Sequence, residues 1–178
     1  MNQNTNNNIE TTLESLFRRR SHRAFAQAPI DEQSITTIIQ AGAAAPSAHG
    51  KKPFRFARIE NASTIESIVE KFPWFAPAGK AASNILVLGD PEQCARTEYW
   101  TVDCAAATEN ILLAAQALGL GAVWMGIAPV EENIVNFRSL MEIPANLVPF
   151  SLISIGYPET PTTNERERPV AEDFIITL

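Results

Sequence analysis

Basic side chains gather early in the chain, in the run Arg18-Arg19-Arg20-Ser21-His22-Arg23. Guanidinium groups form paired hydrogen bonds with phosphate oxygens, and a serine adds a short hydroxyl donor. Because the formal net charge of the whole chain is -6, this cluster suits one small, doubly charged ligand better than a long polyanion. A phosphate monoester is the natural candidate. The other interpretation is that cations favour the C-terminal end of a helix, and this segment alone does not decide between the two.

The composition is that of an acidic globular chain. Its 178 residues suffice for one domain with a substantial core, and 46% of them are hydrophobic. A pI near 5.0 argues against general nucleic-acid binding, which usually requires a basic face. The two cysteines and two histidines are too few and too scattered for a disulfide framework or a metal site. We therefore expect free thiols in a reducing cytoplasm.

The amino-terminal residues do not have the form of a targeting segment. Residues 1–8 are polar and rich in asparagine, without the basic and apolar regions of a signal peptide, so we expect a disordered tail. The apolar stretch over 104–125 is interrupted by polar residues, which argues against a membrane span. We expect residues 9–178 to form one soluble, cytoplasmic domain, with a C-terminal extension over about 157–178.

Apolar periodicity places the elements that must position these residues. Helical spacing predicts helices over 13–17, 35–42, 63–72, 101–118 and 130–140. Runs of β-branched, aromatic and other apolar residues predict strands over 54–59, 85–88, 122–125 and 150–155. The polar sequences at 11–14 and 63–66 have the form of a helix-capping box, which predicts that helices begin there.

The helix predicted over 101–118 is apolar around most of its circumference, which favours burial in a core or in a subunit interface. We interpret Glu109 and Asn110 as hydrogen-bonded structural groups on this helix, and Asp103 as a residue near its N-terminus. The terminal run Phe174-Ile175-Ile176 has no apolar neighbours in sequence. It fits either an extension that reaches another subunit or a C-terminal strand on the chain's own sheet.

Four segments follow one another in a distinctive order. They are Arg19-Arg20-Ser21-His22-Arg23-Ala24-Phe25, Ala45-Pro46-Ser47-Ala48-His49-Gly50-Lys51-Lys52-Pro53-Phe54, the stretch over 103–126 with its core Glu109-Asn110-Ile111-Leu112-Leu113-Ala114-Ala115, and Ile155-Gly156-Tyr157-Pro158. In this order and spacing they resemble the FMN-dependent nitroreductase family in its short form. Each motif alone is weak, but together they cover residues 9–168 and make a strong signal.

The resemblance implies an α+β fold with a central, mostly antiparallel sheet flanked by helices. It also implies a homodimer with a long buried interface helix and two FMN sites at the subunit boundary. Arg19, Ser21 and Arg23 match the positions that hold the FMN phosphate and nearby oxygens, with Arg20 contributing mainly through its backbone.

Three further segments acquire roles from the resemblance. The loop Pro46-Ser47-Ala48-His49-Gly50 matches the one that reaches the flavin from the partner subunit, and Trp124-Met125-Gly126 matches the strand end whose backbone faces the isoalloxazine ring. Arg166 and Arg168 match a late basic pair that returns to the phosphate. The two arginine groups lie far apart in an acidic chain, which is the pattern expected if both bind the same anion.

The loop departs from the usual family pattern PSxxNxQPW. Gly50 stands in place of Asn, Lys52 in place of Gln and Phe54 in place of Trp. The missing Asn amide removes an expected hydrogen bond to the flavin, and Gly50 leaves room or allows close approach of the backbone. Lys52 either adds positive charge near the pyrimidine edge of the flavin, raising its reduction potential, or is a solvated surface lysine. Trp74 and Phe75 form either an aromatic lid or packing at the dimer edge.

The activity implied by the resemblance is that of an FMN-dependent oxidoreductase. NADH or NADPH would reduce the flavin at N5, and a small electron-poor acceptor, such as a nitroaromatic or a quinone, would then take its place. Because the flavin carries the chemistry, we predict no catalytic side chain and no metal. Two alternatives stay open: a flavin carrier or regulatory protein without nicotinamide turnover, and a same-fold flavoenzyme that performs dehalogenation or metabolite dehydrogenation. We expect no nucleic-acid or membrane partner.

Overall fold

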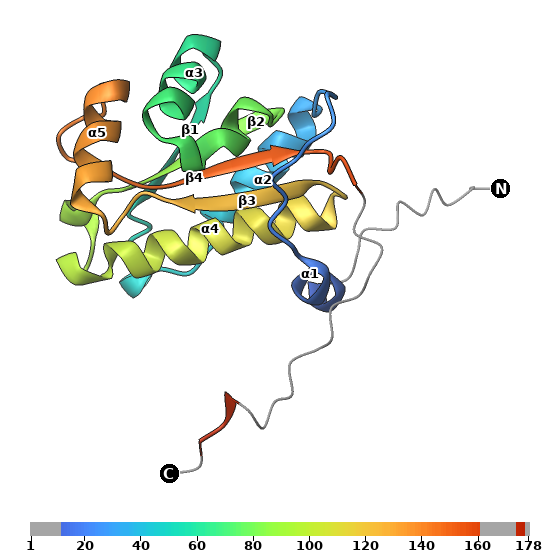
Figure 1. Cartoon of the computed structure of the whole chain (residues 1–178). Helices are drawn as coiled ribbons and strands as arrows, with labels where there is room; N and C mark the ends of the chain where they lie inside the picture. Colours follow the sequence, from blue (N-terminus) through green and yellow to red (C-terminus); the bar gives the residue numbers. More distant parts are fainter. Residues whose placement is uncertain (1–11, 161–173, 177–178) are drawn as a thin grey trace.

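The computed structural model describes residues 12–160 and 174–176 (Figure 1). Within these residues, one antiparallel sheet has the strand order β1-β2-β4-β3. The strands are β1 Phe54–Ile59, β2 Ser83–Gly89, β3 Gly121–Gly126 and β4 Val148–Gly156. The α-helices are α1 Thr12–Arg18, α2 Glu32–Ala43, α3 Ala62–Lys71, α4 Trp100–Ala117 and α5 Glu131–Met141. The predicted α+β fold, with an antiparallel sheet flanked by helices, is confirmed.

The sheet separates two apolar cores. On one face, Ile85 and Val87 of β2 pack with α2 and α4, and on the other, Leu86 and Leu88 pack with α3 and α5. Figure 1 shows α4 below the sheet and α3 and α5 above it. Because side chains alternate along a strand, a strand covered on both faces must be apolar throughout. This requirement explains the uninterrupted apolar run that predicted β2.

Helix α4 crosses the sheet with one face in the first core. Its buried residues are Asp103, Cys104, Ala107, Thr108, Ile111, Leu112 and Ala115. The remaining positions are mostly half-buried, and Val102 is 60% exposed. The predicted burial of this helix in a core is confirmed for one face, whereas burial of the other face in a subunit interface stays a prediction.

Helices α2 and α3 begin after short polar side chains that cap them. Asp31 caps α2, where its carboxylate accepts a hydrogen bond from the N–H of Ser34 at 2.8 Å. The capping box predicted at 63–66 is wrong, because Asn61 is the N-cap of α3. The Asn61 amide oxygen accepts from the N–H groups of Ser63 and Thr64, so the helix begins at Ala62, one residue earlier than predicted. The other predicted box includes Thr11, which lies outside the described residues.

The run Phe174-Ile175-Ile176 is not part of the sheet, so the expectation of a C-terminal strand is wrong. These three residues are 75%, 65% and 83% exposed. Between residues 12 and 160 and at 174–176, the chain contains no helix long and apolar enough to span a membrane.

Candidate functional site

The arginine segment is fastened to the open edge of β3. Ser21 forms a parallel β-bridge with Ala122, and the backbone N–H of His22 donates to the Ala122 carbonyl at 3.0 Å. Further along, Phe25 bridges Pro158, just beyond the end of β4. The segment therefore covers a sheet edge that would otherwise present unpaired backbone groups. Sheet pairing, rather than helix termination alone, fixes where these basic residues lie.

Two glycines allow this segment to lie close against the sheet. A Cβ atom on Gly121 would lie 2.8 Å from Cβ of His22, and one on Gly156 would lie 2.8 Å from Cδ1 of Phe25. His22 therefore packs on the face of β3 to which residue 121 belongs. Trp124, three positions later, projects to the opposite face.

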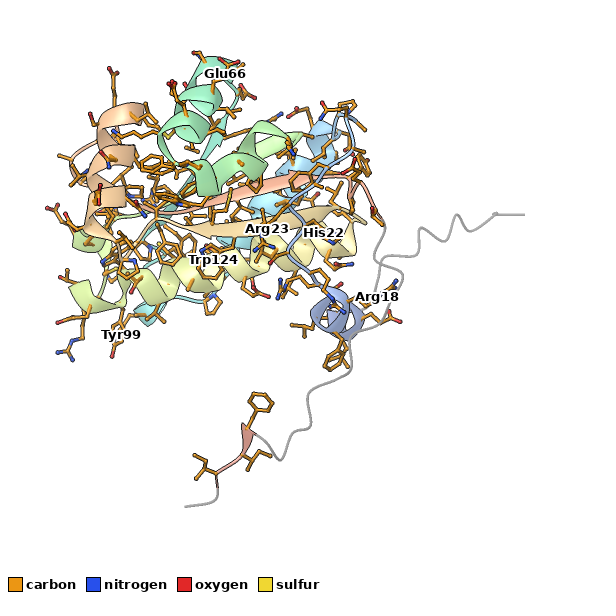
Figure 2. The ribbon with its side chains drawn as sticks, in the orientation of Figure 1. Arg18, His22, Arg23, Glu66, Tyr99 and Trp124 are labelled. Atoms are coloured by element: carbon orange, nitrogen blue, oxygen red, sulfur yellow. The ribbon has the colours of Figure 1, made fainter. Side chains whose placement is uncertain are left out.

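The neighbours of His22 project to the same face as Trp124. Side chains alternate along an extended segment, so Ser21 and Arg23 point away from the His22 side. Both are exposed, and because Ser21 pairs in parallel with Ala122, Arg23 is level with Trp124 along the strand; Figure 2 labels both residues. The hydroxyl of Ser21, the guanidinium of Arg23 and the indole of Trp124 therefore project to the same face.

Arg19 is tied to the middle of α4. Its Nε lies 3.3 Å from Oε1 of Glu109, and the two side chains are 29% and 41% exposed. Burial raises the pKa of Glu109, and the charge of Arg19 offsets part of that effect. This ion pair fixes the end of α1 against α4, on the same face of the sheet as Trp124.

The remaining basic residues of the cluster point elsewhere. Nη1 of Arg20 donates to the carbonyls of Phe17 and Arg19, so this side chain turns back on its own segment. Arg18 and His22 line a cavity of about 270 Å³ together with Gln116, Gly119, Leu120, Tyr157 and Pro158. The cluster therefore divides into Arg19, Ser21 and Arg23 on the Trp124 side, and residues used for other contacts.

The loop that begins at Pro46 is held from three elements. Oδ1 of Asp103, on α4, accepts from the N–H of Ala48 at 3.0 Å. Nζ of Lys52 donates to the Ala43 carbonyl at the end of α2 at 2.8 Å, and Nη1 of Arg55, on β1, donates to the Lys52 carbonyl at 3.1 Å. Such anchoring gives an exposed loop a defined shape.

The same loop has positive φ angles at three of its residues. The φ angles of His49, Gly50 and Lys52 are 53°, 67° and 48°. Glycine adopts this left-handed region freely, whereas His49 and Lys52 do so at a cost. The N–H of Lys52 donates to Oγ of Ser47 at 2.8 Å, which helps to hold the strained turn. Strain maintained by neighbouring bonds is typical of functional loops.

The third predicted segment, Trp124-Met125-Gly126, lies at the end of β3. Trp124 is half-buried, and its ring centroid lies 5.7 Å from that of Phe150. Met125 is buried in the core on the other face, whereas Gly126 is exposed. A Cβ on Gly126 would meet nothing closer than the Ala128 carbonyl oxygen at 3.8 Å, so space is open above this strand end.

The structure brings some of the predicted site residues together and not others. The arginine segment and Trp124 share one face, but the loop is attached to α4 six residues from Glu109. Six residues correspond to about 9 Å along a helix and about 120° around it. Between residues 12 and 160, no hydrogen bond or ion pair joins the loop to Arg19, Ser21 or Arg23. Arg166 and Arg168 lie outside the described residues.

Phe75 is fully buried in the second core, whereas Trp74 is 59% exposed. For Phe75, both the lid and the dimer-edge interpretation are wrong, because its ring packs on Phe72 and Phe137. In the described part of the chain, no group of three His, Cys, Asp or Glu side chains is arranged to hold a metal ion.

Sequence reasoning missed two residues that position the site. Asn110 donates to the Ala41 carbonyl, as expected of a structural group, but Glu109 pairs with a candidate ligand. Asp103 holds the loop across the fold from the first turn of α4. Acidic residues on an otherwise apolar helix were the available signal, although their partners lie far away in sequence.

Comparisons with known proteins agree on one family. The model of the nitroreductase family matches residues 16–101 and 95–157. A predicted NADH dehydrogenase/NAD(P)H nitroreductase of Archaeoglobus fulgidus is 38% identical over 152 residues, which cover 85% of this chain and 87% of that protein. An NADPH-flavin oxidoreductase of Vibrio harveyi is 25% identical over 163 residues, covering 85% of this chain and 67% of that protein.

A solved structure gives the same result. The crystal structure of a predicted nitroreductase of Desulfovibrio desulfuricans in complex with FMN superimposes with a TM-score of 0.79 at 29% identity, covering 95% of this chain and 98% of that one. Motifs, fold and relatives coincide over most of the chain, and the protein therefore belongs to the nitroreductase family.

Proposed function

We propose that this protein is a homodimeric, FMN-dependent NAD(P)H oxidoreductase. The observation that carries the proposal is the bridge between Ser21 and Ala122, because it sets an anion-binding segment beside Trp124 at the edge of β3. An anion site next to an aromatic side chain and an open strand end suits a ligand with both a phosphate and a flat ring. Relatives include an NADPH-flavin oxidoreductase and a nitroreductase bound to FMN.

The residues present fit FMN. Arg19, Ser21 and Arg23 supply guanidinium and hydroxyl donors for a phosphate monoester, with Arg166 and Arg168 proposed as a second basic pair. The backbone of Trp124, Met125 and Gly126 would lie beside the ring, where open space above Gly126 leaves room. The chemistry that FMN supplies when bound is ping-pong hydride transfer through N5, from NADH or NADPH to an electron-poor acceptor such as a nitroaromatic or a quinone.

A second copy of the chain would complete the site. The loop over 46–52, with its candidate flavin contacts Pro46, Ser47, Ala48, Gly50 and Lys52, is attached to a different side of α4 from Arg19. A loop from the partner subunit would reach a flavin that the chain's own loop does not. Apolar residues on α1 support such an association, because Leu13, Leu16 and Phe17 are 64%, 46% and 39% exposed.

The chain's own residues would bind and orient the cofactor and the substrates. Fixed guanidinium groups neutralise the phosphate, and donors aimed at the ring favour the form with more negative charge. The strained, anchored loop would exclude water and limit the approach of the acceptor. Orientation and electrostatics of this kind need no side-chain nucleophile.

The decisive experiment is an absorbance spectrum of the purified protein in the near-ultraviolet and visible, recorded before and after anaerobic addition of NADH or NADPH. Flavin bands that bleach support the proposed activity. Flavin that stays oxidised contradicts it and favours a flavin carrier, or an enzyme with a different donor. A colourless protein that takes up no added FMN contradicts the flavin site itself.

A further inference from the structure

We infer that Glu109 is a positioning residue for the phosphate of FMN, acting through Arg19. The inference rests on the proposed function, because it assumes that Arg19 binds that phosphate. It starts from the ion pair between Nε of Arg19 and Oε1 of Glu109 at 3.3 Å. A carboxylate beside a phosphate site would repel the ligand, so its presence there suggests a positioning role.

The contact joins Oε1 of Glu109 to Nε of Arg19, at the base of the guanidinium group. We therefore assign the fork of Nη1 and Nη2 to the phosphate. Two parallel N–H donors are the arrangement that matches phosphate oxygens. Arginine is long and flexible, so fixing it before the ligand arrives lowers the ordering cost of binding.

The structure also limits the electrostatic penalty. Glu109 carries one negative charge, whereas Arg19 and Arg23 bring two positive charges to the same side. The site therefore stays positive with the carboxylate in place. Burial raises the pKa of Glu109 because desolvation disfavours its charged form, and the positive charge of Arg19 opposes this effect. Removal of the carboxylate is expected to loosen Arg19 more than it reduces repulsion of the ligand.

The test compares FMN with riboflavin, which has the same ring but no phosphate. Dissociation constants are measured by fluorescence titration of the full-length apoprotein with each ligand. We expect Glu109→Ala to weaken FMN binding about tenfold, the effect of one lost charge-assisted contact, and to leave riboflavin within about twofold. Glu109→Gln keeps an oxygen for Nε without the charge, and should retain FMN affinity within about threefold.

Two further variants separate positioning from general effects. Glu132→Ala removes the same charge from an exposed site on α5 and should change neither affinity. If Glu109 acts through Arg19, then Glu109→Ala should cause no additional loss in an Arg19→Ala background. Equal weakening for FMN and riboflavin would indicate a structural role and overturn the inference.

Two other results would contradict the inference. Tighter FMN binding by Glu109→Ala and Glu109→Gln would mean that the carboxylate repels the phosphate, and it would overturn the inference while leaving the flavin site intact. Wild-type protein that binds riboflavin as tightly as FMN would remove the phosphate role of Arg19, and so overturn the proposed site as well.

Discussion

Asp103 and Ala48 lie 55 positions apart in the chain, and Oδ1 of Asp103 accepts a hydrogen bond from the backbone N–H of Ala48 at 3.0 Å. Asp103 is only 4% exposed, and its Oδ2 has no hydrogen-bond partner in the described part of the chain. Burying a carboxylate with one unpaired oxygen costs free energy of folding. We therefore expect the hydrogen bond made by the other oxygen to serve the fold or the site. Here the bond joins the first turn of α4 to the loop proposed to contact flavin.

We predict that Asp103→Ala loosens this loop. Loss of the acceptor leaves a backbone N–H without its partner, so the free energy of unfolding should fall by about 1–3 kcal/mol. FMN affinity should fall as well. Urea unfolding of the apoprotein and FMN titration measure the two effects. Asp103→Asn is the matched control, because it keeps an oxygen for Ala48 and should lie near wild type in both. An alanine variant equal to wild type in both measurements would contradict the assignment.

The two arginine groups should act together on the cofactor. We predict that Arg19→Ala combined with Arg168→Ala abolishes FMN retention through purification while the chain stays folded. The phosphate would lose guanidinium groups from both ends of the sequence, whereas the Arg19 side chain belongs to neither apolar core. Flavin absorbance per mole of protein measures retention, and far-ultraviolet circular dichroism checks folding. Full occupancy in the double variant would show that these arginines do not hold FMN.

Close packing of the arginine segment gives a test that changes no charge. A Cβ on Gly121 would lie 2.8 Å from His22, so Gly121→Ala should push the segment away from β3 and weaken FMN binding about tenfold or more. Gly79→Ala is the control, since its Cβ would meet only Cγ2 of Val69 at an ordinary 3.6 Å. Titration with FMN compares the variants. If the two alanine variants bound equally well, the close approach at Gly121 would not matter to the site.

The elements were predictable from sequence because each has a local apolar pattern. Strand β2 is one example, since its uninterrupted apolar run follows from burial on both faces, and helix α2 is another, since Ile35 and Ile38 lie on its buried face. The start of α3 was misplaced because Asn61 supplies a cap outside the apolar run. Motif resemblance supplied the candidate ligands, although composition alone left the role of the arginine cluster open.

The contacts that assemble the site were not predictable in this way. Glu109 pairs with Arg19, and Asp103 with Ala48, across long stretches of chain. No local pattern encodes such partners, because they follow from the strand order and from how α4 crosses the sheet. The pairing of Ser21 with Ala122 has the same origin, as it depends on β3 lying at the sheet edge.

The two thiols should react slowly and in a fixed order. Burial, aided by the charges of Asp103 and Asp90, raises the pKa of Cys94, and burial raises that of Cys104 further. The thiolate is the reactive form, so a raised pKa lowers its fraction at neutral pH. We expect iodoacetamide to modify Cys94 more slowly than a free cysteine, with a rate that keeps rising above about pH 8.5. Cys104 should react only after unfolding.

Mass spectrometry of the alkylated protein locates the label. Cys94→Ser is the control, and it should leave the native protein unlabelled, because Cys104 is fully buried. Native labelling of Cys104, or a Cys94 rate that levels off below about pH 8, would contradict the environments assigned to the two thiols.

Lys52 offers a test of electrostatic tuning at the flavin. Its ammonium donates to the Ala43 carbonyl, so its charge is held at the end of α2 in the same loop as Ser47 and Ala48. If a partner's loop brings this charge near the pyrimidine edge, it favours the more negative, reduced flavin. We predict that Lys52→Gln lowers the two-electron midpoint potential of bound FMN by about 30 mV, equivalent to about 1.4 kcal/mol.

Lys51→Gln is the matched control, because it removes the same charge from the adjacent exposed residue. Anaerobic titration against a reference dye measures both potentials. A shift confined to Lys52→Gln supports a fixed charge near the ring. Equal shifts in the two variants would indicate only the general field of the loop, and an unchanged potential in Lys52→Gln would mean that the lysine serves α2 and the loop without influencing the flavin.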